Sequence, residues 1–185
     1  MSAPLLSPGE LTVWSRYIHE LCGVYLDDSK GYLVEARLGD LVRETGSHSF
    51  TELLAKVRAD LTQTLPRKVI DAITTNETSF FRDAAPFELL RSRLIPELIE
   101  RRHQAGRRPV PIRIWSAACS TGQEAYSTAM VLKEVLGDFR GYDIRILGTD
   151  ISDQAITQAS YAHFNRLDLE RGLTPSQLAR HFEPV

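Results

Sequence analysis

The stretch that decides the fold is residues 112–124, Ile-Arg-Ile-Trp-Ser-Ala-Ala-Cys-Ser-Thr-Gly-Gln-Glu. Ile112, Ile114 and Trp115 predict a short buried strand. Small residues then lead to Gly122, and residues 123–136 predict a helix. Strand, tight turn and helix in this order are typical of the start of a nucleotide-binding βαβ unit. Small side chains let the backbone approach a ligand closely, and the first helical turn presents free N–H groups.

The turn itself departs from the glycine-rich pattern. Ala118, Ser120 and Gly122 occupy the positions at which a G-x-G-x-G turn has glycines, so only one of the three glycines is present. A dinucleotide-dependent oxidoreductase is therefore a poor interpretation.

A second strand is predicted over residues 143–150, an apolar-rich run that ends in Asp150. An acid at this place in a βαβ unit accepts hydrogen bonds from ribose hydroxyls. Asp150 lies 28 residues after Gly122, whereas the dehydrogenase pattern has its acid about 20 residues on. A long helix and return loop between Gly122 and Asp150 account for the longer spacing. The alternative is that Asp150 caps the next helix.

Residues 7–74 predict a compact bundle of about four helices. The first begins with Ser7-Pro8-Gly9-Glu10, a capping box with proline at the first helical position. A second capping box lies at residues 49–52. Because the bundle is small, it is expected to dock on the C-terminal part of the chain for stability.

The segment 75–83 breaks the helical pattern and mixes hydrogen-bonding groups, two aromatic residues and a cation. It is either a polar linker anchored by Phe80 and Phe81 or a ligand-contacting segment. A helix comes next, which Pro96 is expected to kink or restart. The basic run at residues 101–108 is interpreted as solvated surface.

Composition narrows the class of protein. The chain has 185 residues, a formal net charge of −2 and 25% charged residues, which argues against a broad nucleic-acid footprint. Cys22 and Cys119 are isolated and the five histidines lack ligand spacing, so no metal site is predicted. No signal peptide or membrane-length apolar run is evident, and the cytoplasm is the expected location.

The fold class predicted is α/β: a small all-α bundle at 1–74, followed at 75–185 by a doubly wound, Rossmann-like domain. Only two strands are evident, whereas such a sheet needs about five to seven. We therefore expect the N-terminal part of a longer protein, or a second chain that completes the sheet.

Three motifs resemble one family. They are residues 75–82, Thr-Asn-Glu-Thr-Ser-Phe-Phe-Arg; residues 115–127, Trp-Ser-Ala-Ala-Cys-Ser-Thr-Gly-Gln-Glu-Ala-Tyr-Ser; and residues 149–151, Thr-Asp-Ile. Their order and spacing, with the helical module before them, resemble the CheR-type chemoreceptor glutamate O-methyltransferases. The family usually has Glu-Glu-Pro-Tyr after the glycine, where this sequence has Gln-Glu-Ala-Tyr at residues 123–126.

The resemblance implies methyl transfer from S-adenosylmethionine to receptor glutamates, with S-adenosylhomocysteine as the product. It implies cofactor binding by Asn76, Thr78, Arg82, Glu124 and Asp150. Arg82 would pair with the cofactor carboxylate through a guanidinium fork, Glu124 would accept from its ammonium group, and Asp150 would take the ribose hydroxyls. Asn76 and Thr78 would supply neutral hydrogen bonds. Arg82 is also a candidate catalytic residue that orients the incoming carboxylate.

The resemblance also implies a partner, the helical cytoplasmic region of a methyl-accepting chemotaxis receptor. The family uses a basic face of the second helix for this contact. Lys30, Arg37 and Arg43 fit that idea only partly, because three acids are interleaved with them. A non-catalytic module that docks on receptors is the alternative, and a nucleic-acid methyltransferase is disfavoured by the charge balance.

Overall fold

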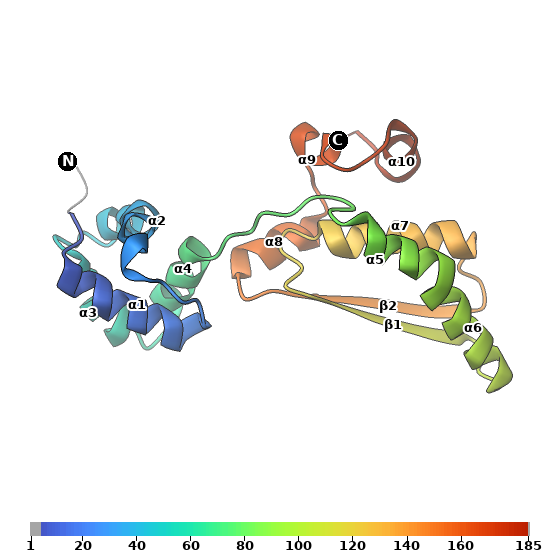
Figure 1. Ribbon diagram of the computed structural model, residues 1–185, viewed down its shortest axis with the longest axis horizontal. Coiled ribbons are helices and arrows are strands. Elements are labelled where there is room, and N and C mark those ends of the chain that lie inside the picture. Colours follow the sequence, from blue (N-terminus) through green and yellow to red (C-terminus); the bar gives the residue numbers. More distant parts are fainter. Residues whose placement is uncertain (1–4, 185) are drawn as a thin grey trace. The chain divides into compact units, whose positions relative to one another are not determined.

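The computed structural model describes residues 5–184 (Figure 1). The chain divides into two compact units, each described by itself. The first contains the residues up to Thr75 together with Ile151–Asp153, and the second contains Asn76–Asp150 and the residues from Gln154 onward.

The first unit is a small helical bundle whose helix ends follow from local capping. Helix α1 begins at Pro8 because Ser7 accepts from the backbone of Glu10 and Glu10 accepts in return, the predicted capping box; Gly23, in a left-handed conformation, ends it. Ser49 accepts from the backbone N–H of Glu52 at the start of a later helix. The Glu52 carboxylate accepts from the N–H of His48 and not from that of Ser49, so only half of the second predicted capping box forms. The helices of this unit are α1 Pro8–Cys22, the 3-10 turn η1 Asp28–Lys30, α2 Gly31–Glu44, α3 Phe50–Ala59 and α4 Thr64–Ile73.

The core of this unit forms around Trp14, which is fully buried. Its indole N–H donates to the carbonyl of Phe50 at 3.0 Å, so the largest core side chain also satisfies its polar atom. The other buried members are apolar residues from all four α-helices: Leu11, Ile18, Val34, Leu38, Leu41, Val42, Phe50, Leu53, Leu54, Val57, Val69 and Ile73. The predicted four-helix bundle is confirmed.

Arg37 is held inside the first unit. Its guanidinium donates to the carbonyls of Ile73 and Thr74 at the end of α4 and to the Thr75 hydroxyl. Arg43 pairs with Asp40 on the surface of α2. The basic face expected on this helix is therefore weaker than its sequence suggests, because one cation is engaged by backbone and another by an acid.

The second unit is built on the predicted strand–helix–strand. Strand β1, Val110–Ala117, pairs in parallel with β2, Tyr142–Thr149, in register from Val110 opposite Tyr142 to Ala117 opposite Thr149. Helix α7, Gln123–Leu136, connects them and matches its predicted range. In Figure 1, α5 and α7 lie on one side of the two strands, and α6 crosses the strands near one end.

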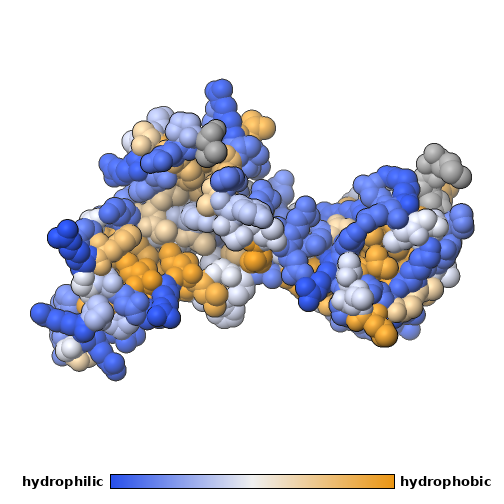
Figure 2. Space-filling view, turned by 180° about the vertical axis from the view of Figure 1, so that it is seen from behind, coloured by the Kyte–Doolittle hydropathy of each residue, from blue (hydrophilic) through white to orange (hydrophobic). Residues whose placement is uncertain are grey.

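Strand alternation decides which side chains are covered. Ile112 is fully buried, and it packs in one cluster with Ile95 of α6 and Leu132 of α7. Trp115 points to the other face and is 69% exposed, opposite Leu147, which is 61% exposed. The prediction that Trp115 is buried was wrong, because Trp115 is out of phase with Ile112 and Ile114 in a strand of period two. Hydrophobic residues accordingly reach the surface of this unit (Figure 2).

The helical segment before β1 changes geometry at the predicted place. Helix α5, Ala84–Leu89, runs into a π-helical turn at Leu90–Leu94, and α6, Ile95–Gln104, comes after it. Pro96 lies at the start of α6. Proline has no N–H to continue an α-helical ladder, so the helix restarts there.

The chain after β2 forms three helices: α8 Asp153–Tyr161, α9 Arg166–Glu170 and α10 Pro175–His181. Asn165 and Asp168 form a capping box that starts α9. Phe164 and Phe182 pack edge-on against Phe80, which is fully buried and so anchors the 75–83 segment. Of the helices within residues 5–184, none has the length and hydropathy to cross a bilayer.

Candidate functional site

The turn between β1 and α7 bends at alternate residues. Ala118, Ser120 and Gly122 have positive φ angles of 57°, 51° and 99°, and these are the three positions matched to glycines in the sequence pattern. A side chain in this region costs roughly 1–2 kcal/mol per residue. The backbone therefore adopts the conformation of a glycine-rich turn with one glycine only.

Ser120 joins two segments that are distant in sequence. Its backbone N–H donates to Asp150 Oδ2 at 2.8 Å, and its hydroxyl donates to the carbonyl of Asn76 at 2.9 Å. Ser120 is 8% exposed, so both bonds are shielded from water. The end of β2 and the segment after Thr75 thus meet at the turn.

A polar cleft of about 600 Å³ lies beside the same turn. Its charged lining includes Arg82, which precedes α5, and Glu124, in the first turn of α7. Within residues 5–184 no ion pair joins these two side chains, and Arg82 instead donates to the carbonyl of Glu77 at 2.9 Å. One cation and two acids, Glu124 and Asp83, therefore line the same cavity. The remaining lining residues are Pro86, Phe87, Leu90, Ile114, Trp115, Ser116 and Thr128.

Ser116 orients one of these charges. Its hydroxyl donates to Glu124 Oε1 at 2.6 Å, and Ser116 is 3% exposed. Sequence reasoning treated Ser116 only as a small residue of the turn. The available signal was a polar residue in phase with Val110, Ile112 and Ile114 on the covered face of a strand, since a buried polar group needs a partner.

The structure brings four of the five predicted cofactor residues together in two pairs, and the fifth, Thr78, belongs to neither pair. Arg82 and Glu124 line the cleft, and Asn76 and Asp150 are joined through Ser120. Thr78 is half-buried in the same loop as Asn76, and no hydrogen bond in the described chain links it to the other four.

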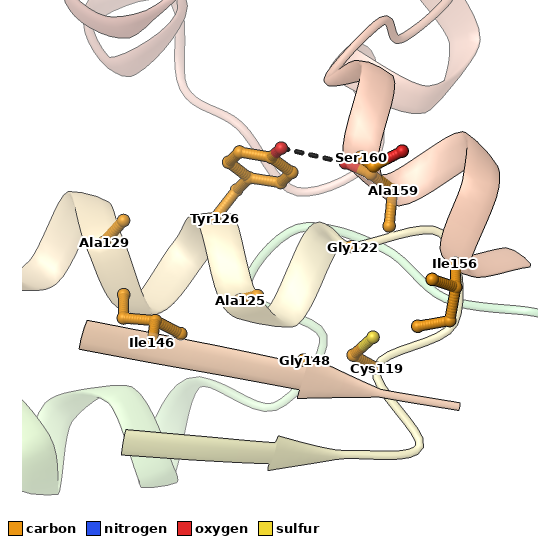
Figure 3. A pocket seen from close by; sticks show the side chains of 10 residues that line it. All are labelled: Cys119, Gly122, Ala125, Tyr126, Ala129, Ile146, Gly148, Ile156, Ala159 and Ser160. Atoms are coloured by element: carbon orange, nitrogen blue, oxygen red, sulfur yellow. Dashed lines mark hydrogen bonds between the residues drawn. The ribbon is translucent and has the colours of Figure 1, made fainter. Parts of the chain in front are cut away.

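A second cavity, of about 330 Å³, has a different character (Figure 3). It lies between α7, β2 and α8, and the Tyr126 hydroxyl donates across it to the carbonyl of Ala159 at 2.8 Å. None of its lining residues carries a formal charge: Cys119, Gly122, Ala125, Tyr126, Ala129, Ile146, Gly148, Ile156, Ala159 and Ser160. A charged ligand would find its partners in the polar cleft and not here.

Comparison with known proteins places the chain. The SAM-binding domain of CheR methyltransferases matches residues 76–185, and the all-alpha domain of CheR methyltransferases matches residues 9–74. The chain belongs to the CheR methyltransferase family. It is 39% identical to chemotaxis protein methyltransferase Cher2 of Pseudomonas putida over 91% of this chain and 60% of that protein.

Two further relatives agree. Chemotaxis protein methyltransferase 1 of Pseudomonas aeruginosa is 40% identical over 90% of this chain and 60% of its own length. The chemotaxis protein methyltransferase of Vibrio anguillarum is 39% identical over 99% of this chain and 65% of its own length. The chain thus spans about 60–65% of the length of these curated relatives.

The structure explains how this CheR-family chain tolerates its departure after the glycine. Gln123, which stands where the family pattern has its first acid, is 3% exposed and accepts from the Thr121 hydroxyl at 2.7 Å. Glu124, which matches the second acid, is exposed and lines the cleft. The neutral replacement falls on a buried position, and the charge in the cleft is retained.

Cys119 does not provide a nucleophile in this turn. Burial raises the pKa of its thiol, and the negative charges of Asp150 and Glu124 raise that pKa further. The thiol is therefore protonated near neutral pH, and a thiol is far less nucleophilic than a thiolate.

Proposed function

We propose that this CheR-family chain binds S-adenosylmethionine and that the protein transfers its methyl group to glutamate side chains of chemoreceptors. The observation that carries the proposal is that a cleft with charged side chains and a fixed carboxylate lie beside the same turn, the one between β1 and α7. Arg82 and Glu124 line the cleft, and Asp150 is held by the turn at the end of β2.

The cleft suits the methionine end of this cofactor, which is a zwitterion. Arg82 is free of ion pairs in the described chain and presents a guanidinium to a carboxylate, a pairing that is often bidentate. Glu124 presents a carboxylate to the ammonium group. The charges are separate in the structure, as recognition of both ends of a zwitterion requires.

The end of β2 suits the ribose. Asp150 follows Thr149 directly, and the N–H of Ser120 fixes one of its oxygens. A carboxylate at this position of a βαβ unit accepts from ribose hydroxyls. Asn76, whose carbonyl is fixed by Ser120, and Thr78 are proposed to add neutral hydrogen bonds.

The proposed methyl transfer requires no proton transfer by the protein. When bound, S-adenosylmethionine supplies a methyl group on a sulfonium, and a carboxylate oxygen can take it in one displacement. Glutamate is ionised at neutral pH, with a reference pKa near 4.3, so no general base is required. The residues must position and desolvate the incoming carboxylate, and Arg82 is the proposed catalytic residue for that orientation.

The proposed partner is the helical cytoplasmic region of a methyl-accepting receptor, which places the protein in the cytoplasm. The relatives are named chemotaxis protein methyltransferases, which supports a substrate in the chemotaxis system. The first unit is proposed to contact the receptor. Because Arg37 and Arg43 are engaged within that unit, the electrostatic part of this contact is expected to be modest.

The test is calorimetric titration of S-adenosylhomocysteine into this chain and into Asp150→Ala. Losing charge-assisted hydrogen bonds should weaken binding by about 1.5–3 kcal/mol, roughly 10- to 150-fold. Asp138→Ala is the matched control, because Asp138 is an exposed acid beyond the end of α7 that pairs with Arg140.

Saturable binding that Asp150→Ala weakens and Asp138→Ala leaves unchanged would support the cofactor site. A folded wild-type chain that does not bind, or that binds equally in all three forms, would contradict it. Methylation of receptor glutamates by the protein is then assayed with labelled cofactor.

A further inference from the structure

We infer that Ser116 is a positioning residue that sets Glu124 for the ammonium group of the cofactor and thereby makes the site selective for ligands that carry an amino-acid end. The inference rests on the proposed function and adds a residue and a specificity to it. It starts from the 2.6 Å hydrogen bond between the Ser116 hydroxyl and Glu124 Oε1.

The bond joins a buried group to an exposed one. Ser116 is 3% exposed on the covered face of β1, and its position is fixed by pairing with Gly148 of β2. Glu124 is exposed in the first turn of α7. The rigid strand therefore determines where the flexible carboxylate lies, and not the reverse.

The position of Glu124 on its helix does not account for this contact. An acid in the first helical turn is stabilised by the helix dipole without any further partner. A hydroxyl at a covered strand position can also be satisfied by nearby backbone. Here the hydroxyl is directed at the carboxylate that shares a cleft with Arg82.

The geometry leaves one carboxylate oxygen for a ligand. Ser116 holds Oε1, and Oε2 of Glu124 has no hydrogen-bond partner in the part of the chain that the structure describes. Holding the side chain in one rotamer in advance removes an ordering cost from binding. The gain applies only to a ligand that reaches Glu124, which is a ligand with an amino group.

The experiment compares two ligands on a set of variants. S-adenosylhomocysteine carries the amino-acid end, whereas 5′-methylthioadenosine keeps the adenosine and the thioether but lacks it. Ser116→Val and Ser116→Thr form a matched pair of nearly equal shape that differ in the hydroxyl. We expect Ser116→Val to weaken S-adenosylhomocysteine binding about tenfold and Ser116→Thr to weaken it less than about twofold. Neither should alter binding of 5′-methylthioadenosine.

A double-mutant cycle tests whether Ser116 acts through Glu124. In a Glu124→Ala background, Ser116→Val should have no further effect, because the group that Ser116 positions is gone. Equal losses for both ligands, additive losses in the cycle, or Ser116→Thr behaving as Ser116→Val would each overturn the inference. A wild-type chain that binds neither ligand would instead contradict the proposed cofactor site itself.

Discussion

The two ends of the same two-stranded sheet use polar residues in opposite ways. At the carboxyl ends of the strands, Ser116 and Ser120 are buried and each makes a hydrogen bond to an acid of the candidate site. Nearer the amino ends, Arg113 and Arg145 both pair with Asp143 on the uncovered face. Arg113 and Arg145 are 47% and 75% exposed in these pairs.

One end of the sheet therefore carries buried hydrogen bonds to acids of the candidate site, and the other carries solvent-exposed ion pairs. A buried donor whose acceptor is removed stays unsatisfied, because water cannot replace the partner. An exposed ion pair exchanges one set of hydrated contacts for another and contributes little. Substitutions at the carboxyl end should therefore change ligand binding and stability, and substitutions near the amino end should change neither.

The largest effect is expected at Gly122. Its φ is +99°, and a Cβ there would lie 3.0 Å from a ring carbon of Tyr126 and 3.1 Å from Cβ of Ala159. Gly122→Ala combines backbone strain with overpacking, and it should lower the free energy of unfolding by about 2–3 kcal/mol. Denaturant titration measures the change.

Gly23→Ala is the control for Gly122→Ala. Gly23 has a φ of +75°, and a Cβ at this position would meet no other group within 4 Å, so only strain of about 1 kcal/mol is expected. If the two variants lose the same stability, packing at the turn is unimportant and the carboxyl end is less constrained than proposed.

Arg82 should give a smaller effect that falls on the ligand. Arg82 is exposed and its guanidinium donates to a backbone carbonyl, so Arg82→Ala should leave the unfolding free energy within about 0.5 kcal/mol of wild type. Loss of the pairing with the cofactor carboxylate should weaken S-adenosylhomocysteine binding by about 1.5 kcal/mol, roughly tenfold.

Turnover separates the two roles proposed for Arg82. With S-adenosylmethionine held saturating, a fall in the rate of receptor methylation by Arg82→Ala would support orientation of the incoming carboxylate. An unchanged rate would restrict Arg82 to cofactor binding.

The contrast between local and long-range signals also explains what the sequence could predict. Helix α1 was predicted from Ser7 and Glu10, and α7 was predicted over its full range, because caps and glycine stops act within a few residues. Helix α9 was missed although Asn165 and Asp168 form a capping box, because five residues are too few for a periodic pattern.

Contacts between residues that are distant in the sequence could not be predicted. The pairing of Ser120 with Asn76 spans 44 residues, and that of Arg37 with Thr75 spans 38. No local pattern encodes such contacts, so Arg37 was assigned only to a partly basic helix face and Ser120 only to a turn. The match of Ala118 and Ser120 to glycine positions in the sequence pattern indicated the positive φ angles of these residues. It did not indicate the hydrogen-bond partners of Ser120.

The smallest effect is expected at Arg113, near the amino ends of the strands. Hydrogen bonding to Arg113 is the main cause of the lowered pKa of Asp143, with smaller contributions from the charges of Arg113 and Arg145. A carboxyl group with a lowered folded-state pKa adds stability above its unfolded pKa, about 3.9 for Asp, and loses it as the pH falls through the folded value. Arg113→Ala should therefore raise the pKa of Asp143 in an NMR titration. Because the pair is exposed, its contribution to stability is small. The thermal melting temperature of Arg113→Ala should therefore match that of wild type at pH 7 and at pH 3, and the affinity for S-adenosylhomocysteine should not change. A loss of affinity comparable to that of Arg82→Ala would show that the two ends of the sheet are coupled, and the contrast between them would fail.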